Sequence, residues 1–158
     1  MSFSLFYGNI KYNLKGWEEN LIMIKLIVGG AGTGKTKTII ELVNAAAKEE
    51  KGSIVCIAKG DKLKFDISYD ARLVNISDYL VEGYKGLLGF ISGIHAGNYD
   101  ITKIYIDGLY KLLDSKDPAT AEAFLRELDA FSTKHSVDFT VTLSEDATAI
   151  TEGMKKYV

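Results

Sequence analysis

The stretch GGAGTGKT, from Gly29 to Thr36, has a residue pattern suited to holding a phosphate. Its glycines allow the backbone to approach phosphate oxygens closely and to take conformations that other residues avoid. Amide groups in a loop that opens a helix can point at an anion, at the positive end of that helix. Lys35 would add a positive charge near the β- and γ-phosphates, and the Thr36 hydroxyl could ligate Mg²⁺. The spacing therefore predicts a nucleoside triphosphate site.

The sequence on either side of this loop supports that interpretation over a chance glycine-rich turn. The apolar run 24–28 before the loop is typical of a strand, and the amphipathic pattern 34–50 after it is typical of a helix. Strand, loop and helix in this order are the setting in which G-x-x-x-x-G-K-[ST] binds a nucleotide. The residues expected to contact ATP are Gly29, Gly30, Ala31, Gly32, Thr33, Gly34, Lys35, Thr36 and Lys37.

An aspartate elsewhere in the chain could complete the site. The segment KIYIDG, 103–108, is typical of a strand, and its last acidic residue is Asp107. Because the carboxyl ends of parallel strands meet at one edge of a sheet, Asp107 is expected beside the loop, where it would share Mg²⁺ with Thr36. Lys35 and Asp107 are the expected catalytic pair. The alternative for Asp107 is a solvated aspartate in a turn.

On these two motifs the chain resembles the P-loop NTPases. GGAGTGKTKTIIELV is similar to the first motif of superfamily 1 helicases. The chain from Met23 onward also resembles small single-domain bacterial ATP-binding proteins, some labelled as relatives of twitching-motility ATPases. The resemblance implies a three-layer α/β fold with a RecA-like, mostly parallel sheet of about five strands, and it implies ATP and Mg²⁺ as ligands.

The chain departs from that family directly after Asp107. Many P-loop ATPases have a glutamate there, which orients or deprotonates the attacking water, whereas this chain has Gly108. ATP hydrolysis is therefore expected to be weak or to depend on a partner. Asp61, Asp78 and Glu145 lie near expected strand ends and could face the γ-phosphate, although turn or capping roles are the alternative for each. Ser144 could contact the γ-phosphate or belong to a plain turn.

The leading functional hypothesis is a small regulatory or accessory ATPase. A nucleotide-dependent switch that hydrolyses nothing and a small-molecule kinase remain as alternatives. Kinases commonly use several arginines to neutralise phosphates, and this chain has only Arg72 and Arg126. A helicase would need a second motor domain, for which 158 residues are too few. A GTPase would carry an Asn/Thr-Lys-x-Asp motif, which is missing.

Composition narrows the setting in which the chain acts. With a net charge of −2 it has no broad positive field, so nucleic-acid binding is not expected. No apolar run reaches the length of a bilayer span and no secretory signal is present, which predicts a cytoplasmic protein without membrane insertion. Cys56 lies in an apolar run and is expected to be a buried, reduced thiol. His95 and His135 fit no metal or triad pattern and are expected to be structural.

The first 22 residues lack a clear period and precede a second methionine, Met23. One hypothesis treats residues 1–22 as an upstream extension outside the native product, with residues 23–158 as the nucleotide-binding domain. The other treats them as an aromatic-rich arm that docks on that domain. The arm would present Phe3, Phe6, Tyr7, Tyr12 and Trp17.

The rest of the chain alternates short apolar runs with helical patterns, which predicts a parallel sheet with crossover helices. Ser77 is expected to cap a helix whose apolar stripe runs from Leu80 to Ile94, and Asp117 with Pro118 to start the next one. Expected strands are 24–28, 53–58, 72–76, 103–107 and 137–143, with a short helix within 144–156.

Glycines recur every three or four residues along the expected helix after Ser77. Because each glycine destabilises a helix, the helix could be broken or packed tightly on its own sheet. The alternative is a close-approach surface for a protein partner, including a second copy of the chain. The residues are Gly83, Gly86, Gly89, Gly93 and Gly97.

Overall fold

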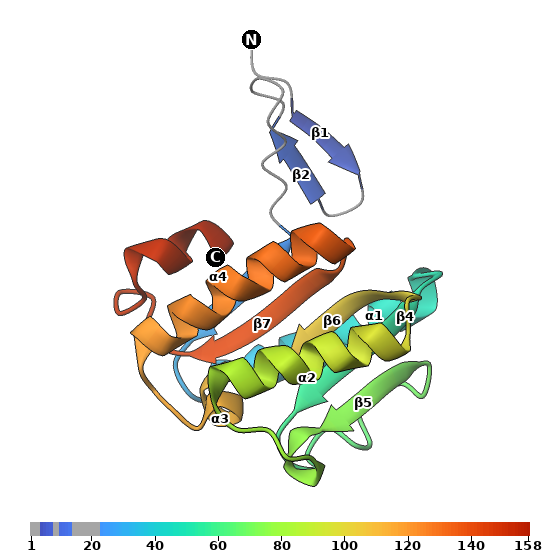
Figure 1. The fold of residues 1–158 in the computed structure, drawn as a ribbon, viewed down its shortest axis with the longest axis horizontal. Coiled ribbons are helices and arrows are strands. Elements are labelled where there is room, and N and C mark those ends of the chain that lie inside the picture. The colour runs from blue at the N-terminus through green and yellow to red at the C-terminus, as the bar shows by residue number, and fades with distance from the viewer. Residues whose placement is uncertain (1–3, 8–9, 14–22) are drawn as a thin grey trace.

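A five-stranded, wholly parallel sheet with helices on both faces forms the body of the molecule in the computed structural model (Figure 1), which describes residues 4–7, 10–13 and 23–158. This confirms the predicted three-layer α/β fold. The strand order is β3-β7-β6-β4-β5. The strands are β3 (Ile24–Gly29), β4 (Ser53–Ala58), β5 (Ala71–Asn75), β6 (Ile101–Ile106) and β7 (Asp138–Ser144).

The helices divide between the two faces of this sheet. Side chains alternate in direction along each strand, so each face acquires its own apolar core. Helix α1 (Lys35–Glu49) packs on one face through Ile39 and Val43. The other face, in front in Figure 1, carries α2 and α4. The helices that contribute to its core are α2 (Gly83–Gly97), the short α3 (Leu109–Leu113) and α4 (Pro118–His135).

Strand β3 lies at the edge of the described sheet, whereas its apolar sequence predicts burial on both faces. Ile24 and Leu26 are buried as predicted, but Lys25 is exposed. The strand pairs with β7 in parallel, from Ile24 opposite Phe139 to Gly29 opposite Ser144. An apolar run alone therefore does not distinguish this edge strand from a central one.

The helix predicted to follow Ser77 starts later, so this prediction is wrong. Ser77 lies in a single 3₁₀ turn, η1 (Ile76–Asp78), where the Asn75 side chain accepts a hydrogen bond from the Ser77 amide. Helix α2 begins at Gly83, and Leu80, predicted to face inward, is fully exposed at 107%. A polar side chain that bonds its own backbone two residues later favours a turn over a helix.

Other local signals are confirmed. The Asp117 carboxylate accepts a hydrogen bond from the Ala119 amide, with Pro118 as the first residue of α4. Residues 59–70 form a series of turns, and Leu63 from this segment is buried in the core that includes Ile39 and Val43 of α1. The five-residue helix α3, directly after Gly108, was not expected from the sequence.

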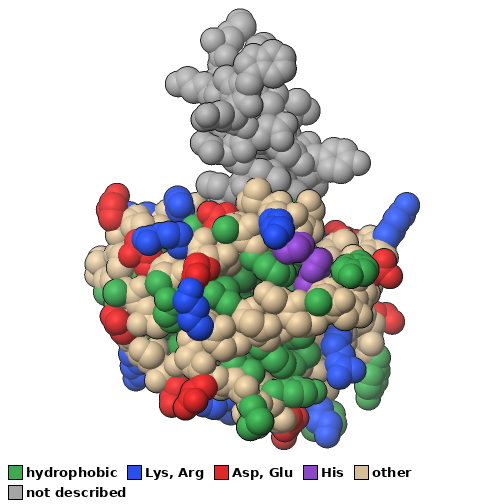
Figure 2. All heavy atoms as spheres, in the orientation of Figure 1, with side chains coloured by type: hydrophobic (Ala, Val, Ile, Leu, Met, Phe, Trp, Pro, Cys, Tyr) green, Lys and Arg blue, Asp and Glu red, His purple; other side chains and the backbone are tan. Residues whose placement is uncertain are grey.

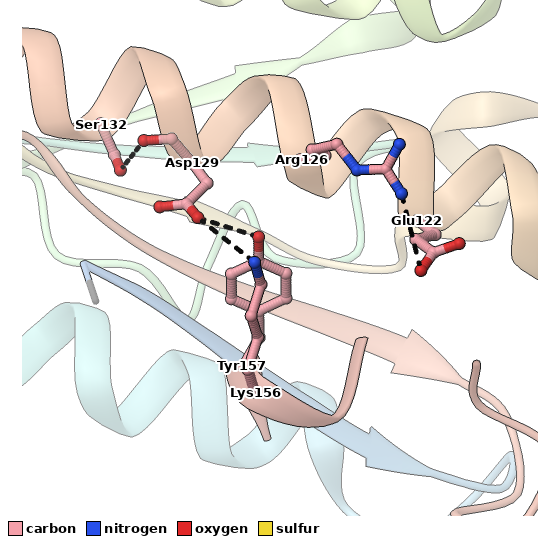
Figure 3. A network of polar contacts seen from close by, with 6 residues as sticks. All are labelled: Glu122, Arg126, Asp129, Ser132, Lys156 and Tyr157. Carbon is pink, nitrogen blue, oxygen red and sulfur yellow. Dashed lines mark hydrogen bonds and ion pairs between the residues drawn. The ribbon is translucent and has the colours of Figure 1, made fainter. Parts of the chain in front are cut away.

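The C-terminal segment ends in the 3₁₀ helix η2 (Glu152–Tyr157), which packs against α4. Figure 3 shows the polar contacts that hold it there: the Tyr157 hydroxyl donates to Asp129 Oδ2 at 3.0 Å, and the Lys156 ammonium lies 4.0 Å from the same oxygen. Met154 and Tyr157 are buried. The segment therefore closes the apolar core on the α4 side.

Within residues 1–22 the structure describes a two-stranded antiparallel pair, β1 (Ser4–Tyr7) and β2 (Ile10–Asn13). Residues 1–3, 8–9 and 14–22, which include Phe3 and Trp17, lie outside the described residues. The two hypotheses for this segment concern its origin and its side chains, so both remain predictions.

Candidate functional site

The glycine-rich loop connects edge strand β3 to the start of α1. Gly32 and Gly34 have φ angles of +76° and +85°, in the left-handed region that favours glycine. Gly34 precedes the first helical residue, and the Thr38 amide donates to the Gly34 carbonyl at 3.0 Å. No side chain caps the N-terminus of α1, and its first turn contains no acidic residue. The amides of this turn therefore lack helical acceptors at the positive end of the dipole, a favourable setting for an anion.

The Lys35 side chain folds back over the loop. Its ammonium donates to the Gly30 carbonyl at 2.7 Å, and the Thr33 hydroxyl donates to the same oxygen at 2.7 Å. A Cβ at Gly29 would lie 2.6 Å from the Thr33 hydroxyl, so any other residue at this position would have to displace the Thr33 side chain. The loop residues from Gly30 to Gly34 are exposed. The charge of Lys35 is thus held at an open loop.

The structure brings Thr36 and Asp107 together, as the metal prediction requires. The Thr36 hydroxyl lies 3.2 Å from Asp107 Oδ2 and 3.4 Å from Oδ1. Asp107 directly follows β6, and β7 separates β6 from β3 in the sheet. A hydroxyl and a carboxylate are hard oxygen ligands of the kind that Mg²⁺ prefers.

Thr142, on the intervening strand β7, was not identified from the sequence. Its hydroxyl donates to Asp107 Oδ1 at 2.8 Å and accepts a hydrogen bond from the Gly108 amide at 2.7 Å. Thr142 is only 1% exposed, whereas Asp107 and Gly108 are partly buried. The two hydrogen bonds orient the Asp107 carboxylate and the turn that starts α3. Only the pairing of β6 with β7 reveals this role, because the residues are 35 positions apart.

Of the three carboxylates considered near strand ends, Glu145 is the one that contacts the loop strand. Its backbone amide donates to the Gly29 carbonyl at 3.1 Å. Its carboxylate accepts hydrogen bonds from the Tyr110 hydroxyl and from the Asp146 amide, each at 3.1 Å. Burial, followed by the hydrogen bond to Glu145, raises the pKa of Tyr110 to about 12, so this phenol remains a donor at neutral pH.

Asp61 and Asp78 have other surroundings. Asp61 lies in the turns after β4, and its carboxylate accepts a hydrogen bond from the side chain of Asn75, the last residue of β5, at 3.3 Å, which fits the turn role. Asp78 is exposed in η1. Ser144 is exposed and lies opposite Gly29 in the β3–β7 register. Lys37 is exposed in the first turn of α1.

The arginines are away from the loop. Arg72 lies near the start of β5, whereas the loop follows the carboxyl end of β3 in the same parallel sheet. Arg126 is on α4 and pairs with Glu122. This distribution does not favour a kinase, which would place arginines at the phosphates.

Cys56 lies in the middle of β4 and is fully buried, which confirms the prediction of a buried, free thiol. Burial, with a smaller contribution from the charge of Asp107, raises the pKa of the Cys56 thiol to about 12. A thiol of this kind is neutral at physiological pH and unreactive. Cys56 therefore belongs to the core.

The two histidines lie side by side on the face that carries α2 and α4 (Figure 2). The His95 and His135 ring centroids are 4.6 Å apart, and both rings contact Phe131. The described part of the chain contains no group of three or more His, Cys, Asp or Glu side chains able to hold a metal ion. The ring contacts themselves join the ends of α2 and α4.

Helix α2 runs without a break from Gly83 to Gly97, so the interpretation of a broken helix is wrong, and the free space at three of its glycines contradicts tight packing on the sheet. A Cβ at Gly89, Gly93 or Gly97 would meet no atom within 4 Å. A cavity of about 600 Å³ lies beside this face, lined by Gly93, Gly97 and the Tyr79 and Phe90 rings, which contact each other at a tilt of 43°. In Figure 2 the backbone of α2 is visible between hydrophobic side chains. The glycines therefore leave an open surface.

No protein-family model matches the chain, and no curated protein matches it significantly. Among the described residues, no helix has the length and apolar character needed to cross a membrane.

Proposed function

We propose that the chain binds ATP with Mg²⁺ at the glycine-rich loop and hydrolyses it slowly, as a small regulatory or accessory ATPase of the P-loop type. The contact between Thr36 and Asp107 is the observation that carries this proposal. It joins two motifs that are 71 residues apart, in the arrangement that a shared Mg²⁺ requires. The phosphates would lie against the amides of the loop and the first turn of α1, near the Lys35 ammonium.

The absence of a glutamate at position 108 supports slow turnover. Gly108 has a φ of +77° and opens α3, and its amide is bound to Thr142, so this position offers backbone geometry and no acid or base. General-base assistance is typically worth about 10²–10⁴-fold in rate. Turnover would then depend on another carboxylate or on a partner.

The test compares binding and phosphate release in wild type and in two lysine variants. Lys35→Ala should weaken Mg-ATP binding by about 10–100-fold, since hydrogen bonds to a charged group contribute about 1.5–3 kcal/mol. Lys48→Ala is the matched control, because Lys48 is exposed at the other end of α1. Competition by GTP and other nucleotides would establish the base preference. Equal affinity of wild type and Lys35→Ala would refute the proposed site.

A non-hydrolysing, nucleotide-dependent switch is the second candidate, favoured by the open glycine face of α2. In this case the face formed by Gly89, Gly93 and Gly97 would contact α2 of a second copy, because glycines let two helices approach closely and two-fold dimers are the commonest assembly. Sedimentation with and without Mg-ATP tests it, with Gly89→Leu as the disrupting variant. A wild-type monomer under both conditions would exclude it.

A further inference from the structure

The proposed ATPase site lacks an evident base for the attacking water. Asp107 already accepts hydrogen bonds from Thr142 and Thr36, and its proposed role is to hold Mg²⁺. A carboxylate bound to a cation is a poor proton acceptor, so a second acidic group is needed. Gly108 cannot supply it.

Glu145 lies where such a group would be useful. It follows β7 directly, and its backbone amide is bound to the carbonyl of Gly29, the first residue of the glycine-rich loop. This backbone bond fixes Glu145 beside the loop whatever its side chain does. Because β7 lies between β3 and β6, the residue also stands between the two halves of the site.

The Glu145 carboxylate is held by a tyrosine from the Asp107 side of the site. Tyr110 lies in α3, two residues after Gly108, and its hydroxyl donates to Glu145 Oε2 at 3.1 Å. Tyr110 is buried, which restricts its ring to this position. The second oxygen, Oε1, accepts from the Asp146 amide. Each carboxylate oxygen keeps a further lone pair, so the group can still accept a proton from water.

We propose that Glu145 is the general base of this site and that Tyr110 is its positioning residue; the inference rests on the proposed ATPase function. Water attacks the γ-phosphorus and forms a new P–O bond. The bond from the γ-phosphorus to the β,γ-bridging oxygen breaks, and ADP leaves with that electron pair. The proton lost by the water goes to the Glu145 carboxylate and from there to solvent, so the products are ADP, phosphate and a proton.

The other carboxylates do not have this arrangement. The Asp61 carboxylate accepts a hydrogen bond from the side chain of Asn75, at the end of β5. Asp78 is exposed in η1, after the strand at the opposite edge of the sheet from β3. Neither forms a hydrogen bond to the loop or to Asp107 within the part of the chain that the structure describes.

The experiment measures Mg-ATP affinity and the single-turnover rate of phosphate release separately. Glu145→Gln keeps an acceptor for Tyr110 but cannot take a proton, so its rate should fall by at least about tenfold, and up to about 10²–10⁴-fold, with unchanged Mg-ATP affinity. Glu145→Asp should retain part of the rate. Tyr110→Phe should lower the rate by a smaller factor, again without loss of affinity. Glu152→Gln is the control, because Glu152 is exposed in η2.

The outcomes separate this inference from the function on which it rests. A normal rate in Glu145→Gln overturns the base and leaves the ATPase standing. A wild type that binds Mg-ATP but releases no phosphate also overturns the base and favours the switch. A loss of affinity in Glu145→Gln that accounts for the lower rate means that Glu145 is structural. If wild type binds no Mg-ATP at all, that result refutes the proposed ATPase function itself, and with it the role of Glu145.

Discussion

The Thr36 hydroxyl lies within hydrogen-bond distance of both carboxylate oxygens of Asp107, at 3.2 and 3.4 Å. One residue belongs to the first turn of α1 and the other follows β6. Their contact joins the glycine-rich loop to the centre of the sheet.

Replacing Asp107 with Asn should remove the dependence of ATP binding on Mg²⁺. The carboxylate supplies the charge that would hold the cation, so Mg-ATP affinity should fall by about tenfold, equivalent to about 1.4 kcal/mol. Affinity for ATP in EDTA should stay near that of wild type. Titrations with and without Mg²⁺ measure both values. Thr36→Ser, which keeps the hydroxyl, should behave as wild type, and an equal loss with and without Mg²⁺ would contradict a metal role for Asp107.

Thr142→Val should destabilise the fold. The change keeps the shape but leaves the partly buried Gly108 amide without its acceptor and removes one of the two hydroxyls that donate to Asp107. A buried polar group without a partner costs about 1–3 kcal/mol, which urea unfolding would detect. Thr142→Ser retains the hydroxyl and should lose less. If valine proves as stable as threonine, the bonds of Thr142 do not hold this turn.

The Gly89→Ala/Gly93→Ala variant should be more stable than wild type. Both positions are helical with free space around the added Cβ. Alanine is favoured over glycine in a helix by about 0.5–1 kcal/mol per site. Gly108→Ala is the contrasting variant, since the φ of +77° at Gly108 disfavours alanine. Thermal unfolding measures both shifts, and a destabilised double variant would show that the glycine face is not open.

Stability should fall as the pH drops below about 6.5, the ordinary pKa of histidine. Burial, then the charges of His95 and Lys134, lower the pKa of His135 in the folded state. The unfolded chain therefore binds a proton first on acidification, and this draws the equilibrium toward unfolding. His135→Gln should show a smaller loss of stability between pH 7 and about 5.5. Identical pH profiles would mean that His135 titrates alike in both states.

Most of the features predicted correctly from the sequence depend on residues that are close together in the chain. The loop before α1 and the Asp117 cap of α4 have local causes in glycine conformations and in a side chain that bonds a nearby amide. One local feature was missed: the Asn75 side chain accepts a hydrogen bond from the Ser77 amide, and the 3₁₀ turn that results delays the start of α2 to Gly83.

The parts that could not be predicted depend on strand order. Thr142 and Glu145 reach the site only because β7 lies between β3 and β6, and no residue pattern specifies that order. For the same reason the sequence alone could not distinguish Glu145 from Asp61 and Asp78 as the carboxylate that faces the γ-phosphate. Helix α3 was missed because five residues are too few to show a period.

The placement of β3 at the edge has a mechanical consequence. Among the described strands only β7 pairs with it, so one ladder of backbone hydrogen bonds holds the strand that leads into the loop. A displacement of the loop relative to Asp107 must either shear this ladder or move β7, which is joined through Ser136 and Val137 to the end of α4. Amide exchange along β3 and β7 would therefore report directly on what the loop holds.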